Sequence, residues 1–195
     1  MSPIRFAHLA VFVLASALAA AAFAQAPAAE EDPRQMDEAA RQAYATTLRE
    51  AKSALDQKHY AEATAKLDKL IRERPREPQA RFMKGLVLTD EGRTDDAIAL
   101  FRALLADYPE LPEPRNNLAV LYAKKGEYAL ARDELERAVQ AAPDYAVAHE
   151  NLGDVYARLA EVEYEKTLAF DKRNKTAAAK LKLIREASQP TPPPK

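Results

Sequence analysis

The central part of the sequence repeats itself at one fixed spacing, with a period of about 34 residues. A proline recurs at Pro75, Pro109 and Pro143, and a glycine recurs at Gly92 and Gly126. Three further columns of small or apolar residues keep the same step: Ala51, Gly85, Ala119 and Gly153; Ala63, Ala97 and Ala131; Leu67, Phe101 and Leu135. Self-similarity at a period of this size predicts a stacked repeat array, in which each unit buries its apolar face against its neighbours.

Each repeat divides into two segments with the periodicity of a helix. In the first segment, Tyr44, Leu48, Ala51 and Leu55 fall three or four positions apart, which places them on one helical face. Composition agrees, because alanine is abundant and the chain has only four glycines. Most of its 13 prolines stand between periodic segments or in the last six residues, where they do not interrupt helices. The sequence therefore predicts an all-α fold.

These columns resemble the tetratricopeptide repeat, whose units are antiparallel helix pairs of about 34 residues. The third unit shows the resemblance throughout, with Gly126-Glu127-Tyr128 at the turn, then Ala131, Leu135, Ala138 and Pro143. The second unit has Thr94 in place of the turn aromatic, and the first has Lys58 in place of the turn glycine. The resemblance implies a right-handed superhelical stack of helix pairs, with units at about residues 44–77, 78–111 and 112–145.

A fourth unit matches the repeat pattern in its first helix and then departs from it. The triplet at 151–153 restates that at 117–119, but Ala160 stands where the turn glycine belongs, and no Gly or Pro occurs between Val155 and Phe170. The deleted turn leaves either one long helix, which we favour, or a tightened helix pair, over 146–174. A further helix at 175–187, with one apolar and one basic face, is expected to cap the stack.

The two ends of the chain carry other signals. Residues 1–24 are predicted to be a signal peptide, with Arg5 before an apolar stretch and Ala22-Phe23-Ala24 at the cleavage site. The apolar stretch would be roughly 21 Å long as a helix, too short for a bilayer core of about 30 Å, so no stable membrane insertion is expected after cleavage. The alanine-rich leader indicates bacterial export, hence a periplasmic location. Residues 25–36 are expected to form a flexible linker and 188–195 a disordered, proline-rich tail.

Catalysis and cofactor binding find little support in the sequence. The chain has no cysteine, and only His59 and His149 lie outside the leader. His149-Glu150 begins like a zinc-protease motif, but Gly153 stands where the second histidine is needed. With a net charge of −1 and no basic cluster, nucleic acid is not an expected partner. We therefore expect no enzyme activity, no cofactor and no metal.

The resemblance also implies that the first helix of each unit lines a concave groove. Carried over position by position, the groove residues are Ala45, Leu48, Arg49 and Lys52; Gln79, Phe82, Met83 and Leu86; Glu113, Asn116, Asn117, Val120 and Lys124; and Val147, Glu150, Asn151, Asp154 and Arg158. The three apolar residues of the second unit form either an exposed binding patch or a contact between units.

Asparagines at 117 and 151 stand one repeat apart, in the column where peptide-binding members often carry asparagine. An amide side chain both donates and accepts, so it can pair with the backbone of any peptide. The alternative is that these side chains cap or bridge neighbouring helices. Members of the family that grip acidic chaperone tails need basic residues here, whereas this chain has Glu113, Glu150 and Asp154.

The sequence thus predicts a periplasmic scaffold that binds an extended peptide or a helix of a partner protein in the groove of its array. The chain itself is expected to be a monomer or a weak homodimer. Family analogy gives envelope assembly or protein quality control as the setting. The alternative is a structural adaptor that self-associates through its terminal helices and has no peptide site.

Overall fold

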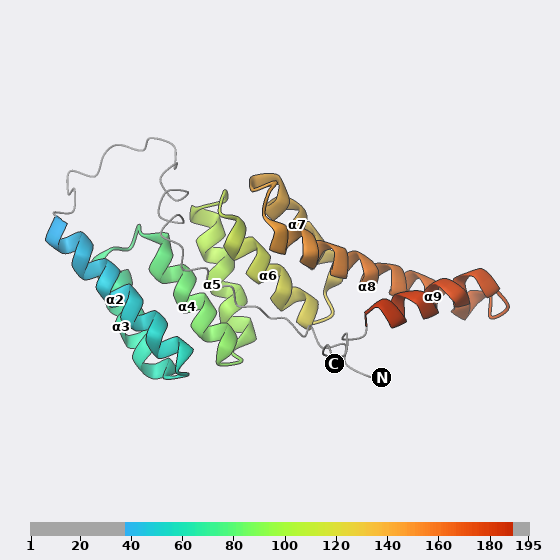
Figure 1. Ribbon diagram of the computed structural model, residues 1–195, viewed down its shortest axis with the longest axis horizontal. Coiled ribbons are helices and arrows are strands. Elements are labelled where there is room, and N and C mark those ends of the chain that lie inside the picture. The colour runs from blue at the N-terminus through green and yellow to red at the C-terminus, as the bar shows by residue number, and fades with distance from the viewer. Residues whose placement is uncertain (1–37, 189–195) are drawn as a thin grey trace, which may run out of the picture.

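The computed structural model describes residues 38–188, and the predicted signal peptide, linker and most of the tail lie outside this range. The described part is all-helical, as predicted, with eight helices and no strand. The helices form an elongated row (Figure 1). In chain order they are α2 (Glu38–Asp56), α3 (Tyr60–Glu73), α4 (Pro78–Asp90), α5 (Thr94–Asp107), α6 (Pro112–Lys124), α7 (Tyr128–Ala141), α8 (Ala146–Phe170) and α9 (Lys175–Ala187).

Consecutive helices pack against each other along the whole row, and the first three units are the pairs α2/α3, α4/α5 and α6/α7. First helices of neighbouring units also touch, since α2 contacts α4 and α6 contacts α8. Pro78 and Pro112 open their helices at the first turn, where a proline costs no helical hydrogen bond. These two prolines therefore mark the start of the second and third units.

The turn between the two helices of a unit needs a residue with left-handed backbone geometry. Gly92 and Gly126 supply it in the second and third units, with φ angles of 81° and 78°. In the first unit Lys58 takes the same conformation, with φ of 61°. Left-handed geometry strains a residue that carries a Cβ atom, so the first turn is held in place by the rest of the fold.

The two helices of the second unit cross at Gly85. The ring of Phe101 on α5 is fully buried there, and it also packs against Phe82 with the ring centroids 5.9 Å apart. A Cβ atom added at Gly85 would lie only 2.3 Å from Cε1 of Phe101. The small residue at this position is therefore what lets α4 and α5 approach each other.

Buried apolar side chains form two clusters rather than one core. The first runs from α2 to α6, and its largest fully buried members are Phe101 and Leu67. The second joins α6, α7 and the start of α8, and contains Leu135 and Val155. Tyr122 on α6 packs against both clusters. Helix α6 is therefore the link between the two halves of the stack.

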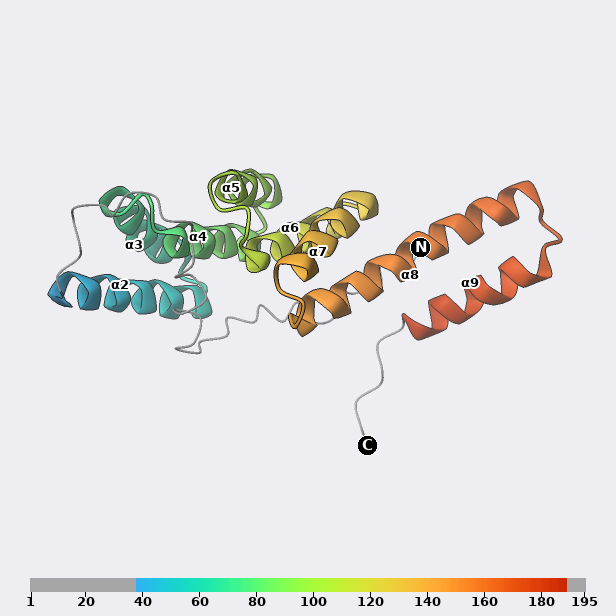
Figure 2. The same ribbon diagram turned by 90° about the horizontal axis from the view of Figure 1, so that it is seen from above.

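The fourth unit contains the single long helix that the sequence favoured. Helix α8 continues for 25 residues with no turn, and α9 returns antiparallel along its distal half (Figure 2). Arg185 on α9 donates to Glu161 of α8 at 2.8 Å and also to Glu165. The two arginines Arg158 and Arg185 hold the pKa of Glu161 below its usual value, chiefly through the hydrogen bond from Arg185.

Because α9 packs so far along α8, nothing lies over Gly153. That glycine is exposed, and a Cβ atom added there would meet no atom within 4 Å. In the second unit, the equivalent Gly85 is covered by the second helix of its own unit. The helix predicted to cap the stack therefore extends it as a hairpin with α8, and buries Ala177 and Leu181 there.

The contrast between the two glycines gives a matched pair of variants. Gly85→Ala should destabilise the protein by about 1–3 kcal/mol, because the new methyl group overpacks against Phe101. Gly153→Ala should stabilise it by about 0.5–1 kcal/mol, because alanine is the better helix former and the site has room. Urea unfolding midpoints of the two variants test this, and shifts in the same direction would contradict the assigned crossing.

The strained turn gives a second prediction. Lys58→Gly should raise the stability by about 1 kcal/mol, since glycine adopts the left-handed conformation without cost. Gly126→Ala, its reverse in the third unit, should lower the stability by a similar amount. Thermal unfolding followed by circular dichroism measures both changes. A neutral or destabilising Lys58→Gly would mean that the turn is not strained.

Candidate protein-binding surface

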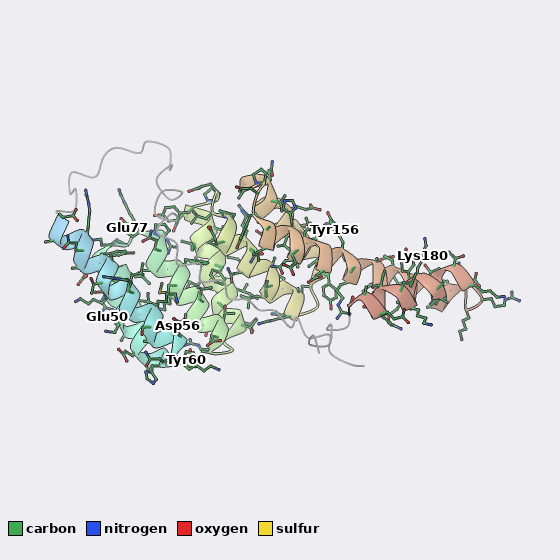
Figure 3. The ribbon with its side chains drawn as sticks, in the orientation of Figure 1. Glu50, Asp56, Tyr60, Glu77, Tyr156 and Lys180 are labelled. Carbon is green, nitrogen blue, oxygen red and sulfur yellow. The ribbon has the colours of Figure 1, made fainter. Side chains whose placement is uncertain are left out.

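The predicted groove residues of α2, α4, α6 and α8 define what we call the first-helix face. At its N-terminal end, Arg49 is exposed and donates to Oγ1 of Thr46 at 3.1 Å. Lys52 is half-buried and forms an ion pair of 2.7 Å with Asp56, which lies at the end of α2 (Figure 3). Both cations thus contact residues of their own helix. The charge of Lys52 is balanced by Asp56, so Arg49 is the cation that this end offers to a ligand.

The apolar trio in the second unit lies mostly in the core. Leu86 is only 6% exposed, so it is a packing residue rather than a surface for a ligand. Phe82 and Met83 are half-buried and pack against the first core cluster, Phe82 through the ring of Phe101. Leu86 and most of Phe82 are therefore occupied by core packing, although the Phe82–Phe101 contact lies within the second unit rather than between units.

The asparagines also take part in internal contacts. Asn116 is 6% exposed, and its Oδ1 accepts a hydrogen bond of 2.8 Å from Nδ2 of Asn151. This bond bridges α6 and α8, as the alternative interpretation of Asn151 expected. Asn117 donates from Nδ2 to the carbonyl of Glu113 in its own helix, also at 2.8 Å. Among residues 38–188, the side-chain oxygens of Asn117 and Asn151 accept no hydrogen bond.

Acidic groups collect where α6 meets α8. Oε2 of Glu113 is shielded from solvent and has no hydrogen-bond partner in the described part of the chain. Burial raises the pKa of Tyr145 to about 12, and the negative charge of Glu113 adds a smaller contribution in the same direction. Burial also raises the pKa of Asp154, with a further contribution from Glu150 and an opposing one from Arg158. This end of the first-helix face therefore carries negative potential.

The remaining predicted residues differ in their exposure. Arg158 is half-buried and is held by Glu161 on its own helix at 2.6 Å. Leu48 is half-buried against the first core cluster. The half-buried positions also include Gln79, Val120 and Val147, whereas the exposed ones are Ala45, Lys124 and Glu150.

Two ion pairs that sequence reasoning did not predict join the first and second helices of a unit. Arg115 on α6 pairs with Glu134 on α7 at 2.8 Å, with side chains only 12% and 16% exposed. Arg81 on α4 pairs with Asp107 on α5 at 2.6 Å. The two arginines stand one repeat apart, but their carboxylate partners do not, so the periodicity could indicate the arginines and not the pairs. They link the two helices of the second unit and the two helices of the third.

No catalytic arrangement is visible on this face. Within residues 38–188, no group of three or more His, Cys, Asp or Glu side chains is placed to hold a metal ion. His149 contacts the carbonyl of Pro143 at 2.9 Å, which accounts for its position at the start of α8. No helix in this range is long and apolar enough to cross a membrane.

Comparison with known families agrees with this architecture. Two family models with the description tetratricopeptide repeat match the chain, over residues 48–112 and 88–159. The chain contains tetratricopeptide repeats. The second matched segment ends in α8, near the point at which the fourth unit departs from the pattern. Tetratricopeptide arrays are scaffolds for protein–protein interaction, and this array is one.

Two curated relatives share only part of their length with this chain. The TPR repeat-containing thioredoxin TTL4 of Arabidopsis thaliana is 37% identical over 79 residues, which are 40% of this chain and 12% of that protein. The human protein O-mannosyl-transferase TMTC1 is 29% identical over 100 residues, 49% of this chain and 11% of that protein. The chain thus spans about a tenth of the length of either relative.

Solved structures show the same fold. The first TPR domain of human RPAP3 has a TM-score of 0.57 at 15% identity, covering 62% of this chain and 94% of that domain. PilF of Pseudomonas aeruginosa has a TM-score of 0.57 at 20% identity, covering 75% and 69%. MamA has a TM-score of 0.54 at 21% identity, covering 73% and 81%. At this identity the likeness concerns the fold alone.

The bridge between α6 and α8 gives a testable asymmetry between the two asparagines. Asn151→Ala should cost about 1–3 kcal/mol, because it leaves the buried Oδ1 of Asn116 without a donor. Asn117→Ala should cost well under about 1 kcal/mol, because its side chain bonds only to a carbonyl of its own helix. Urea unfolding of both variants measures the difference. Equal costs would contradict a stabilising role for the bridge.

Proposed function

We propose that the first-helix face binds an extended segment or a helix of a partner protein. The observation that carries this proposal is the separation of charge along the face. Arg49 gives the α2 end a cation that forms no ion pair among residues 38–188, whereas Glu113, Glu150 and Asp154 make the α6–α8 end acidic. Complementary charge steers encounter and fixes the direction of a bound chain. The ligand is therefore a segment with acidic residues at one end and basic residues at the other.

Polar groups at the α6–α8 end of the face can hold the ligand backbone. The side-chain oxygens of Asn117 and Asn151 accept no hydrogen bond from residues 38–188, so they can accept from a peptide N–H group. Their Nδ2 atoms each give one proton to an internal bond, which fixes the direction of the amides. Such pre-ordered acceptors lose little entropy on binding.

The setting of this interaction is also a proposal. The apolar, alanine-rich stretch within residues 1–24 supports export to the bacterial periplasm, with cleavage after Ala24. In that compartment, envelope assembly or protein quality control are the processes in which a peptide-binding scaffold would serve. The protein would act there by binding, without catalysis.

The alternative is an adaptor that self-associates through its terminal helices. It is favoured by the apolar side chains that α8 and α9 leave exposed, among them Tyr156 and Leu183. Light scattering coupled to size-exclusion chromatography separates the two functions. A stable dimer at micromolar concentration, together with no recovered peptide ligand, would favour the adaptor.

The peptide-binding function is tested with ligands selected from a displayed peptide library on the full chain. Selected peptides should carry opposite charges at their two ends. Glu150→Lys combined with Asp154→Lys should weaken a selected peptide by about two- to fivefold for each charge, measured by fluorescence anisotropy.

A matched control places the same charge change elsewhere. Glu62 and Glu73 on α3, the second helix of its unit, are exposed and do not belong to the first-helix face. Glu62→Lys combined with Glu73→Lys should leave the affinity unchanged. If both double variants lose affinity equally, the effect is one of net charge, and the proposed face is not the binding site.

A further inference from the structure

The turn between α8 and α9 lies at the extreme end of the molecule's long axis, in both views (Figures 1 and 2). We call residues 170–175 the hairpin tip. It begins with Phe170, the last residue of α8, whose side chain is 91% exposed. A phenylalanine so exposed has no packing role in the fold. The tip also holds Lys172, Arg173 and Lys175, all exposed.

Basic residues along the rest of the hairpin have partners within the hairpin. Lys166 pairs with Glu163 at 2.7 Å, and Arg185 bonds to Glu161 and Glu165. Further examples are the ion pair of Lys182 with Glu186 at 3.7 Å and the contact of Lys180 with the ring of Tyr164 at 5.6 Å. Lys180 lies on α9, within the hairpin (Figure 3). The charges of Lys166, Lys182 and Arg185 are thus balanced by carboxylates of the hairpin, whereas Lys180 packs over an aromatic ring.

The tip is different. In the part of the chain that the structure describes, no ion pair involves Lys172, Arg173 or Lys175. The one carboxylate at the tip, Asp171, accepts a hydrogen bond of 3.1 Å from the backbone N–H of Arg173. Three uncompensated cations and one unpacked aromatic ring thus project together at the far end of the protein.

We propose that the hairpin tip docks on an anionic phospholipid surface, with Phe170 entering the interface and the cations facing the headgroups. Basic residues near an anionic bilayer each contribute to binding, and an aromatic ring is suited to the zone between headgroups and acyl chains. The tip projects at the far end of the molecule (Figures 1 and 2), so it can reach a broad surface such as a bilayer.

This surface is separate from the first-helix face. The proposed peptide site runs along α2 to the first half of α8, whereas the tip lies beyond that half and begins at the last residue of α8. A protein bound to lipid through the tip therefore keeps the first-helix face free. The proposal does not rest on the peptide-binding function, and either can fail without the other.

The absence of tryptophan from the sequence makes a local test possible. Phe170→Trp places the only indole at the tip, so its fluorescence reports on the tip even if residues 1–24 also touch lipid. Full-length protein is mixed with vesicles of phosphatidylglycerol and phosphatidylcholine, or of phosphatidylcholine alone. The emission should shift to the blue with the anionic vesicles only. Salt at about 1 M, where the screening length is roughly 3 Å, should reverse the shift. No shift would overturn the proposal.

Control variants separate the tip from general effects. Leu130→Trp, on α7 at a residue 47% exposed, should show no shift. In vesicle sedimentation, Lys172→Gln and Arg173→Gln should each weaken binding about fivefold. Arg72→Gln and Arg102→Gln, at exposed positions of α3 and α5, should have no effect. Equal losses in the two sets would overturn the proposal, since binding would then follow net charge.

Nucleic acid is the competing polyanion, and it is tested with polyuridylic acid. Lipid docking predicts that Phe170→Ser weakens binding to anionic vesicles and that polyuridylic acid does not displace the protein from them. Displacement by polyuridylic acid, with no effect of Phe170→Ser, would overturn lipid docking in favour of nucleic-acid binding. All variants should keep the helix content of the parent protein by circular dichroism, because the substituted side chains are exposed.

Discussion

The close approach of two helices at a small residue is the contact on which the array depends. In the second unit the fully buried ring of Phe101 occupies the space that a side chain at Gly85 would need. The same spacing along the chain separates Ala51 from Leu67 and Ala119 from Leu135, and all four are buried. Each crossing sets one helix pair, and each pair then presents its second helix to the next unit. The repeat in the sequence is thus a repeat of one packing contact.

Where that contact is lost, the architecture changes. No side chain covers Gly153, and α8 runs on where the earlier first helices turn. Helix α9 buries only Ala177 and Leu181, so the hairpin has little apolar contact of its own. Ion pairs between the two helices, such as Arg185 with Glu161, also stabilise the hairpin. The same departure leaves apolar and basic groups of α8 and α9 exposed.

Sequence periodicity predicted the helices and their pairing more completely than it predicted which residues lie on the binding surface. The repeat period located three helix pairs, and the missing turn glycine indicated the long helix. Leu86 and Asn116 were assigned to a binding surface, yet both are buried, because a first helix packs against helices on several sides. A single stripe of apolar residues cannot show how many neighbours a helix has. The bond between Asn151 and Asn116 likewise depends on how α6 and α8 lie, which spacing alone does not determine.

The unbroken length of α8 makes the end of the molecule a rigid spacer. A helix of 25 residues is roughly 37 Å long at 1.5 Å per residue, and α9 stiffens its distal half. A flexible linker of the same length would let the two ends of the protein move independently. With α8 in its place, any body engaged by the hairpin tip is held at a set distance and angle from any body engaged by the repeats. Inserting or deleting residues within α8 would therefore rotate the hairpin tip relative to the repeats by about 100° per residue. It would also change the distance between them.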